Sequence, residues 1–231
     1  MALCMLEGAG NRTYDLTHNH NDGVLTNGPI WKPGRNGAAI SFDGVDDYVR
    51  LHSNYVFTVN HSIGMWIKPS TVLEKRALFG DINTSYYGYL KFVFNSGATR
   101  FVGETNTNSD FIRFEHPDYP FSLDSWYHII VTEDNNKIWT MYIDGGSWSS
   151  TSSVGATLNP NLTINTIGYG YSGAYWGGII DDVRIWNRAL SPQEVQDLYI
   201  NPYGFIYQPQ KYWLMPQGVT IPPHLLFRRV A

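Results

Sequence analysis

Two short stretches of the sequence combine tyrosines with glycines in a way that suits carbohydrate binding. The stretch "TSYYGY" contains Tyr86 and Tyr87, and the stretch "GYGYSGAYWGG" contains Tyr169, Tyr171 and Tyr175. Aromatic rings can stack against the faces of sugar rings, while polar groups fix the hydroxyls in a mostly preformed recess. These tyrosines are therefore the predicted ligand-binding residues. The alternative is that they lie on a plain surface or pack against the fold.

A polar loop near the N-terminus offers ligands for a metal ion. In "DLTHNHNDG", the side chains of Asp15, Asn19, Asn21 and Asp22 provide hard oxygen donors within one loop. Calcium prefers donors of this kind. The alternative is that Asp15 and Asn21 bond backbone amides in turns.

The stretch "GGIIDDVRIW", residues 177–186, predicts a strand with a pair of adjacent aspartates. Side chains alternate between the two faces of a strand, so Asp181 is expected on the same face as Val183 and Ile185. If those two apolar residues face the core, Asp181 faces it too. A buried carboxylate needs a cation, hydrogen-bond donors or a shifted pKa.

One short helix is expected directly after this strand. Ser191 can cap its first turn, Pro192 suits its first position, and Glu194 completes an S-x-x-E capping box. The sequence Asn201-Pro202 ends it, because proline disfavours a helical conformation in the residue before it. Such a helix has about two turns and must be stabilised by packing.

The rest of the chain up to residue 200 favours strands. Apolar residues alternate with period two, and turn sequences recur about every ten residues, as in a two-sheet antiparallel sandwich. The expected strand regions are residues 37–51, 62–69, 89–96, 99–104, 125–134, 137–146, 163–170 and 177–186. The sequence therefore predicts an all-β sandwich over residues 1–200.

Composition excludes several classes of partner. The 231 residues carry 16 Lys and Arg against 20 Asp and Glu, a net charge of −4 that offers no general basic surface for nucleic acid. No apolar run approaches the length of a membrane span, so membrane insertion is not expected. The single cysteine, Cys4, cannot form an internal disulfide.

Residues 201–231 form a segment of different character. They contain five of the 12 prolines and several large apolar residues, without a helical or strand period. A solvated linker would not carry residues such as Phe205, Trp213 and Leu214. We expect this extended tail to dock on its own sandwich or on another subunit, in a homo-oligomer or a larger capsid or tail assembly.

Six blocks, in order, resemble one known family. They are "EGAGNRTYDLTHNHNDGVLTNGP", "GAAISFDGVDDYVRL", "SIGMWIKP", "SWYHIIVTED", "MYIDGG" and "GGIIDDVRIWNRALSPQEVQDLY". The resemblance is to the laminin G-like jelly-roll domains of the concanavalin A-like lectin/glucanase superfamily. It implies a jelly-roll fold closed by one helix. It also implies a structural calcium near the N-terminal loop, with Asp181 as a distant ligand beside Asp15 and Asn21, or else Asp181 accepting hydrogen bonds from a neighbouring loop.

The resemblance leaves function open, because this superfamily contains glycan-binding modules, glycosidases and structural domains. The E-x-D-x-x-E strand pattern of its glucanases does not occur in the sequence, and no catalytic residues are predicted. We expect a non-catalytic surface, attachment or structural component with possible binding of cell-surface glycans. The alternatives are a soluble lectin module and a divergent glycosidase.

The expected location follows from the N-terminus. The start "MALCMLEGAGNRTYD" lacks the basic and apolar parts of a signal peptide. Domains of the family that the chain resembles, however, normally work outside cells. Release by cell lysis would reconcile the two observations. The sequence therefore predicts a protein of a bacteriophage virion, of decoration, fibre or adhesin type, or an extracellular protein without a signal peptide.

Overall fold

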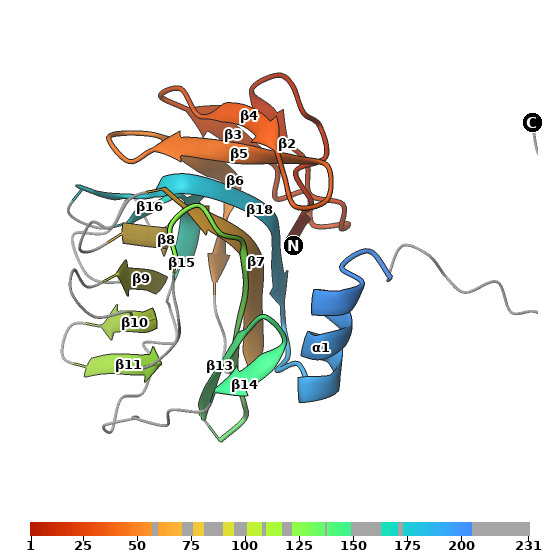
Figure 1. The fold of residues 1–231 in the computed structure, drawn as a ribbon, viewed down its shortest axis with the longest axis vertical. Helices are drawn as coiled ribbons and strands as arrows, with labels where there is room; N and C mark the ends of the chain where they lie inside the picture. Colours follow the sequence, from red (N-terminus) through yellow and green to blue (C-terminus); the bar gives the residue numbers. More distant parts are fainter. Residues whose placement is uncertain are drawn as a thin grey trace, which may run out of the picture.

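The structure is a computed structural model of the 231-residue chain. It describes residues 1–56, 60–70, 76–80, 90–94, 101–107, 110–116, 122–136, 138–148, 163–170 and 173–204. Two antiparallel β-sheets and one helix make up these residues (Figure 1).

The first sheet contains eight strands in the order β14-β13-β12-β7-β18-β5-β4, with β1 also paired to β18. Their bounds are β1 Ala2–Leu3, β4 Ile30–Pro33, β5 Ala38–Asp43, β7 His61–Pro69, β12 Tyr127–Glu133, β13 Trp139–Ile143, β14 Gly146–Trp148 and β18 Gly177–Trp186. Strand β18 therefore has three partners, β7, β5 and β1.

The second sheet also contains eight strands, in the order β11-β10-β9-β8-β15-β6-β3-β2. Their bounds are β2 Arg12–Thr13, β3 Gly23–Thr26, β6 Tyr48–Val56, β8 Arg76–Gly80, β9 Leu90–Phe94, β10 Phe101–Thr107, β11 Asp110–His116 and β15 Thr163–Ile167. A separate two-stranded hairpin pairs β16, Tyr169–Gly170, with β17, Ala174–Tyr175.

The core lies between the two sheets, which form the two layers seen in Figure 1. Ile67 and Ile180 from the first sheet join Val49 and Ile167 from the second in one buried cluster. Each of these side chains is 0% exposed. The predicted all-β jelly-roll sandwich is confirmed. Each expected strand region coincides, wholly or in part, with strands of the structure. These strands are β5 to β7, β9, β10, β12, β13, β15 and β18.

A β-bulge in β18 contradicts the expected orientation of Asp181. Asp181 pairs with Trp66 and Ile180 with Ile67, but the register then shifts before Arg184 pairs with Gly64. Directly paired residues share a face of the sheet, so Asp181 lies on the face of Trp66 and away from the core. The expectation that Asp181 shares a face with Val183 was wrong, because the bulge adds one residue and reverses the alternation.

Helix α1, Pro192–Ile200, covers the outer face of the first sheet (Figure 1). Its predicted start is confirmed, because Ser191 is the N-cap and forms the capping box with Glu194. Leu190 and Val195 form a separate buried cluster with Ile130 of β12 and Tyr142 of β13, two strands of the first sheet. These apolar contacts hold α1, which follows the end of β18, against the outer face of the first sheet.

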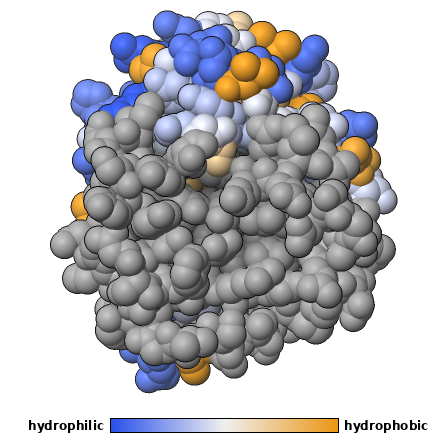
Figure 2. Space-filling model, turned by 90° about the vertical axis from the view of Figure 1, so that its left-hand side faces the viewer, coloured by the Kyte–Doolittle hydropathy of each residue, from blue (hydrophilic) through white to orange (hydrophobic). Residues whose placement is uncertain are grey.

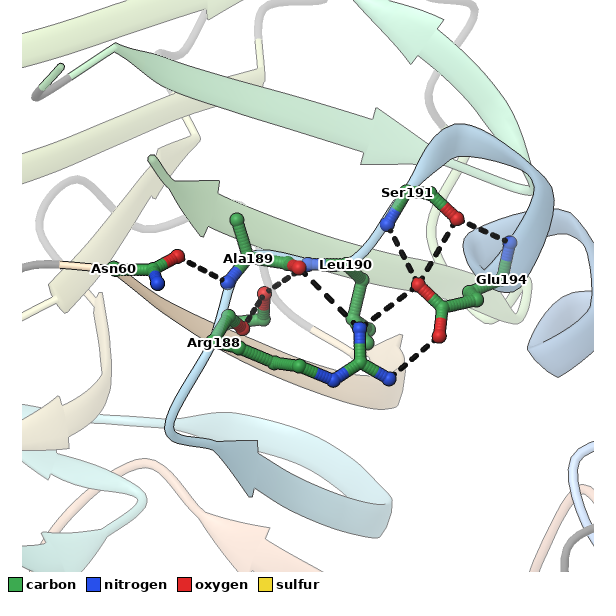
Figure 3. Close-up of polar contacts among 7 residues, drawn as sticks. Asn60, Arg188, Ala189, Leu190, Ser191 and Glu194 are labelled. Carbon is green, nitrogen blue, oxygen red and sulfur yellow. Dashed lines mark hydrogen bonds and ion pairs between the residues drawn. The ribbon is translucent and has the colours of Figure 1, made fainter. Parts of the chain in front are cut away.

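Hydrogen bonds fix the turn that leads into α1, as Figure 3 shows. The side chain of Asn60 accepts a bond from the backbone N–H of Ala189 at 2.7 Å. The Arg188 guanidinium donates to the Glu194 carboxylate, with one Nη1–Oε2 distance of 2.9 Å. This ion pair holds the pKa of Glu194 down at about 2, so Glu194 is ionised in its capping role at neutral pH.

The described surface is mainly hydrophilic where it is visible at the upper end of one face (Figure 2). Some apolar residues of the described part are exposed, among them Ile30 and Val45, as is usual on protein surfaces. Within the described ranges, no helix is both long enough and apolar enough to span a membrane. The predicted tail lies outside the described residues from residue 205 onward, so the boundary near residue 200 stays a prediction.

Replacing the N-cap tests how α1 is held. In the unaltered protein, the Ser191 hydroxyl accepts a hydrogen bond from the backbone N–H of Glu194 at 3.3 Å. The Ser191→Ala substitution removes this acceptor. We expect the free energy of unfolding to fall by about 1 kcal/mol, measured by urea denaturation. Ser191→Thr keeps a hydroxyl and is the matched control. An unchanged value for Ser191→Ala would show that packing and the Asn60 bond alone fix the helix.

Candidate functional site

Three tyrosine rings meet in the fold, two from one hairpin and one from a distant part of the sequence. The ring centroids of Tyr169 and Tyr175 lie 4.7 Å apart, and those of Tyr48 and Tyr169 lie 5.9 Å apart. All three side chains are partly exposed. We call Tyr48, Tyr169 and Tyr175 the tyrosine cluster. The three rings therefore pack on one another and leave part of their surface exposed to solvent.

The backbone around Tyr169 is held closely. Tyr169 and Tyr175 are paired residues of the β16–β17 hairpin. The hydroxyl of Thr166 donates to the carbonyl oxygen of Gly80 at 2.8 Å and also lies 3.1 Å from that of Tyr169. A Cβ atom added at Gly80 would meet the Tyr169 carbonyl oxygen at 2.6 Å. Only glycine permits this approach of strand β8 to the hairpin.

An acidic turn, residues 43–47, precedes Tyr48. The carboxylate oxygens of Asp43, Asp46 and Asp47 lie within 4.8 Å of one another. Asp43 accepts a hydrogen bond from the backbone N–H of Val45 at 2.8 Å, and Asp47 accepts one from that of Asp43 at 2.9 Å. Burial, with the neighbouring charges of Asp43 and Asp46, raises the pKa of Asp47. The turn is thus a defined structure that concentrates negative charge.

The acidic turn and the tyrosine cluster are neighbours. The pKa of Tyr175 is raised by burial first, and then by Tyr169, Asp46 and Tyr48. Asp46 also lies two residues before Tyr48 in the chain, so the acidic turn runs directly into the tyrosine cluster. Ionised carboxylates accept hydrogen bonds, and tyrosine hydroxyls both donate and accept them. Together these groups can bind a ligand that has a flat apolar face and several hydroxyls.

The structure brings together two of the five predicted ligand-binding tyrosines, Tyr169 and Tyr175. Tyr86, Tyr87 and Tyr171 lie outside the described residues. Sequence reasoning missed Tyr48 and the acidic turn. The stretch "FDGVDDY" places three aspartates before an aromatic residue, but nothing local shows that Tyr48 lies beside Tyr169.

Asp15, the first predicted calcium ligand, makes several hydrogen bonds within its own loop. Its Oδ1 atom accepts from the backbone N–H groups of Ala2 at 2.8 Å and Thr17 at 3.0 Å, and its Oδ2 atom accepts from that of Asn21 at 3.1 Å. Burial alone would raise the pKa of Asp15, but these hydrogen bonds outweigh it and lower the pKa. They are the turn contacts that the alternative interpretation expects.

Asp181, the distant predicted ligand, lies under a different loop. Its Oδ2 atom accepts a hydrogen bond from the backbone N–H of Arg35 at 2.9 Å, and the backbone of Asn36 also bonds this carboxylate. Its Oδ1 atom has no hydrogen-bond partner among the described residues. In the described part of the chain, no hydrogen bond joins Asp181 to Asp15 or Asn21, and the three side chains have no partner in common. Calcium binding by these three residues stays a prediction.

A buried aromatic stack occupies the space between the first sheet and α1. The imidazole of His128 lies 4.8 Å from the ring centre of Trp66 and 5.9 Å from that of Tyr199. Burial, followed by the nearby charge of Arg184, lowers the pKa of His128 to about 3. His128 is therefore neutral at physiological pH and packs as an aromatic ring.

Comparison with known proteins identifies the class of this fold. The sequence model described as "Concanavalin A-like lectin/glucanases superfamily" matches residues 43–196. The match covers most of the chain. The chain belongs to this superfamily.

Solved structures with the same fold include domains that bind ligands. Domain 4 of AbnA, a GH43 extracellular arabinanase from Geobacillus stearothermophilus solved in complex with arabinotriose, has a TM-score of 0.68 and 19% identity, covering 86% of this chain and 96% of that chain. The binding domain of Paraclostridial Mosquitocidal Protein 1 has a TM-score of 0.67 and 19% identity, covering 87% and 52%. The receptor-binding domain of botulinum neurotoxin type G has a TM-score of 0.64 and 16% identity, covering 86% and 50%.

These identities are low, so the similarities show the fold alone. This chain matches about half the length of the two toxin binding domains. No curated protein sequence matches the chain at a significant level.

The buried Asp181 gives a pH-dependent prediction. Burial raises its pKa to about 7, above the ordinary value of 3.8. Between these values the folded chain retains a proton that the unfolded chain has lost, so this group lowers the free energy of unfolding as the pH rises. Asp181→Asn cannot titrate. With a metal chelator present, we expect its stability relative to the unaltered protein to increase from about pH 4 to about pH 8.

Urea denaturation of both proteins across this range is the measurement. The two proteins share every other titrating group, so the change of this difference with pH reports Asp181 together with its interaction with the adjacent Asp182. A difference that does not change with pH would contradict the raised pKa.

Proposed function

We propose that this protein is a non-catalytic carbohydrate-binding module, with the tyrosine cluster and the acidic turn as its ligand surface. The observation that carries the proposal is the meeting of Tyr48, Tyr169 and Tyr175 as partly exposed rings beside Asp46. Sugar rings stack on aromatic faces, while fixed polar groups select their hydroxyls.

The charge of the site supports neutral sugars as the ligand class. Asp43 and Asp46 are exposed beside the tyrosines, and the chain as a whole has a net charge of −4. Carboxylates accept hydrogen bonds from sugar hydroxyls but repel sialic acid, sulfate and uronic acid groups. The proposed ligand is therefore a neutral oligosaccharide.

The solved structures support a binding role for this fold. The arabinanase domain was solved with arabinotriose, and the type G neurotoxin domain is a receptor-binding domain. Each is one domain of a larger protein. We extend a binding role to this chain as part of the proposal.

Removing one ring of the cluster tests the proposal. Tyr175→Ala deletes a stacking surface while leaving the sandwich core in place, and we expect binding to neutral oligosaccharides to weaken about tenfold or more. A glycan array followed by calorimetry on the best neutral hit measures the loss. Tyr14→Ala removes a tyrosine that is 50% exposed elsewhere and is the matched control. Equal affinities for both variants would exclude the cluster as the ligand surface.

A structural calcium ion is a second part of the proposal. Asp15, Asn21 and Asp181 are the predicted ligands, and the acidic turn supplies a further group of hard oxygen donors. We expect calcium to raise the midpoint of thermal unfolding over a chelator control, because a ligand that binds only the folded state stabilises it. Comparing Asp15→Asn with Asp46→Asn locates the ion. No shift in the unaltered protein would remove calcium from the proposal.

Attachment of the module to a larger assembly, such as a bacteriophage virion, is the remaining part of the proposal. It rests on the sequence of residues 201–231, in which large apolar side chains occur among prolines. Virion, fibre and free extracellular locations all suit a glycan-binding module.

A further inference from the structure

A groove runs along α1 at the opposite side of the fold from the tyrosine cluster. It encloses about 510 Å³ between the helix and the end of β18. Trp186, Leu190, Leu198 and Ile200 give it apolar walls, and Glu194 and Asp197 place carboxylates along it. Ile200 is 70% exposed, although it lies in the last turn of the helix. A large apolar side chain this exposed at a groove is suited to contact with another segment.

The described chain ends beside this groove. A tight turn follows the helix, in which the backbone N–H of Gly204 donates to the carbonyl oxygen of Asn201 at 3.0 Å. A Cβ atom at Gly204 would meet the Asn201 side chain at 2.8 Å. Gly204, the last described residue, itself lines the groove.

We propose that residues 205–214 of the same chain, "FIYQPQKYWL", are the segment that docks in this groove. The segment supplies the matching apolar side chains Phe205, Ile206, Tyr212, Trp213 and Leu214.

Length fits this assignment. Ten extended residues reach at most about 33 Å. The nine-residue helix is only about 14 Å long at 1.5 Å per residue. The segment can therefore run the length of the groove without strain. A short tether also gives the attached segment a higher effective concentration than the same segment of another molecule.

Charge fits as well. Residues 205–214 contain Lys211 and no Asp or Glu. Of the charged residues that line the groove, Glu194 is paired with Arg188, whereas Asp197 has no ion pair among the described residues, and the last turn of the helix contains no basic residue. A cationic segment next to the carboxyl end of a helix is favourable, because it also complements the helix dipole.

Limited proteolysis of the full chain tests the proposal. Trypsin cleaves after Lys211, inside the docked segment, and after Arg228, outside it. Intact-mass spectrometry follows both cuts, and a free peptide of residues 201–231 supplies their intrinsic rates. Relative to this peptide, we expect cleavage at Lys211 to be slowed about tenfold or more, because a docked segment must open before it is cut. Cleavage at Arg228 should not be slowed.

Ile200→Gln is the decisive variant, because it removes an apolar contact from the groove without adding a site for trypsin. Residue 200 is 70% exposed and glutamine is a good helix former, so the fold should keep its stability. We expect cleavage at Lys211 to reach the rate of the free peptide. Ile30→Gln makes the same exchange at a site that is 53% exposed on strand β4 and should leave Lys211 protected.

Three results would overturn the proposal. Cleavage at Lys211 as fast as in the free peptide would show that the segment is not docked. Protection that survives Ile200→Gln would place the segment elsewhere. Protection that disappears on dilution, together with a dimer by light scattering, would show that a second copy supplies the segment.

Discussion

Strand β18 and the extra residue within it determine how the rest of the structure is arranged. Its first half pairs with both β5 and β7, and its second half pairs with β1 and β7. Between these halves the bulge places Asp182 in the left-handed region, with φ of 50°. Aspartate is among the few residues that tolerate this conformation.

The bulge explains why two adjacent aspartates stand in an apolar strand. Asp182 accepts both of its short bonds from the guanidinium of Arg184, at 2.7 Å each. Asp181 lies on the outer face instead of in the core and binds the loop at Arg35. Breaking one member of such a buried pair is costly, because the other charge remains unpaired. The bulge is therefore fixed by polar contacts on the side of the sheet that faces α1.

Sequence reasoning succeeded where the determining interactions are local. The start of α1 was predictable because Ser191, Pro192 and Glu194 act within one turn of the chain. Tyr169 and Tyr175 were predicted as ligand-binding residues of one short stretch, and the structure pairs them in one hairpin, although the hairpin itself was not predicted.

Reasoning from the sequence failed where topology decides. Tyr48 joins Tyr169 only because β15 pairs with β6, and residues 167 and 49 are partners in that ladder. The prediction for the orientation of Asp181 was wrong for a different reason. One inserted residue in a strand exchanges the two faces for all side chains that follow it. The adjacent aspartates at 181 and 182 were the local indication of this bulge, since aspartate accepts a positive φ.

The same strand positions both surfaces of the molecule and keeps them apart. Tyr175 lies two residues before the start of β18, whose first half pairs with β5 up to Asp43 at the start of the acidic turn. The second half ends at Trp186 in the wall of the α1 groove. Because β16 and α1 lie at opposite sides of the fold in Figure 1, a segment docked on the helix leaves the tyrosine cluster open. The proposed docking of residues 205–214 at one side and the proposed ligand binding at the other therefore require no change of shape in the sandwich between them.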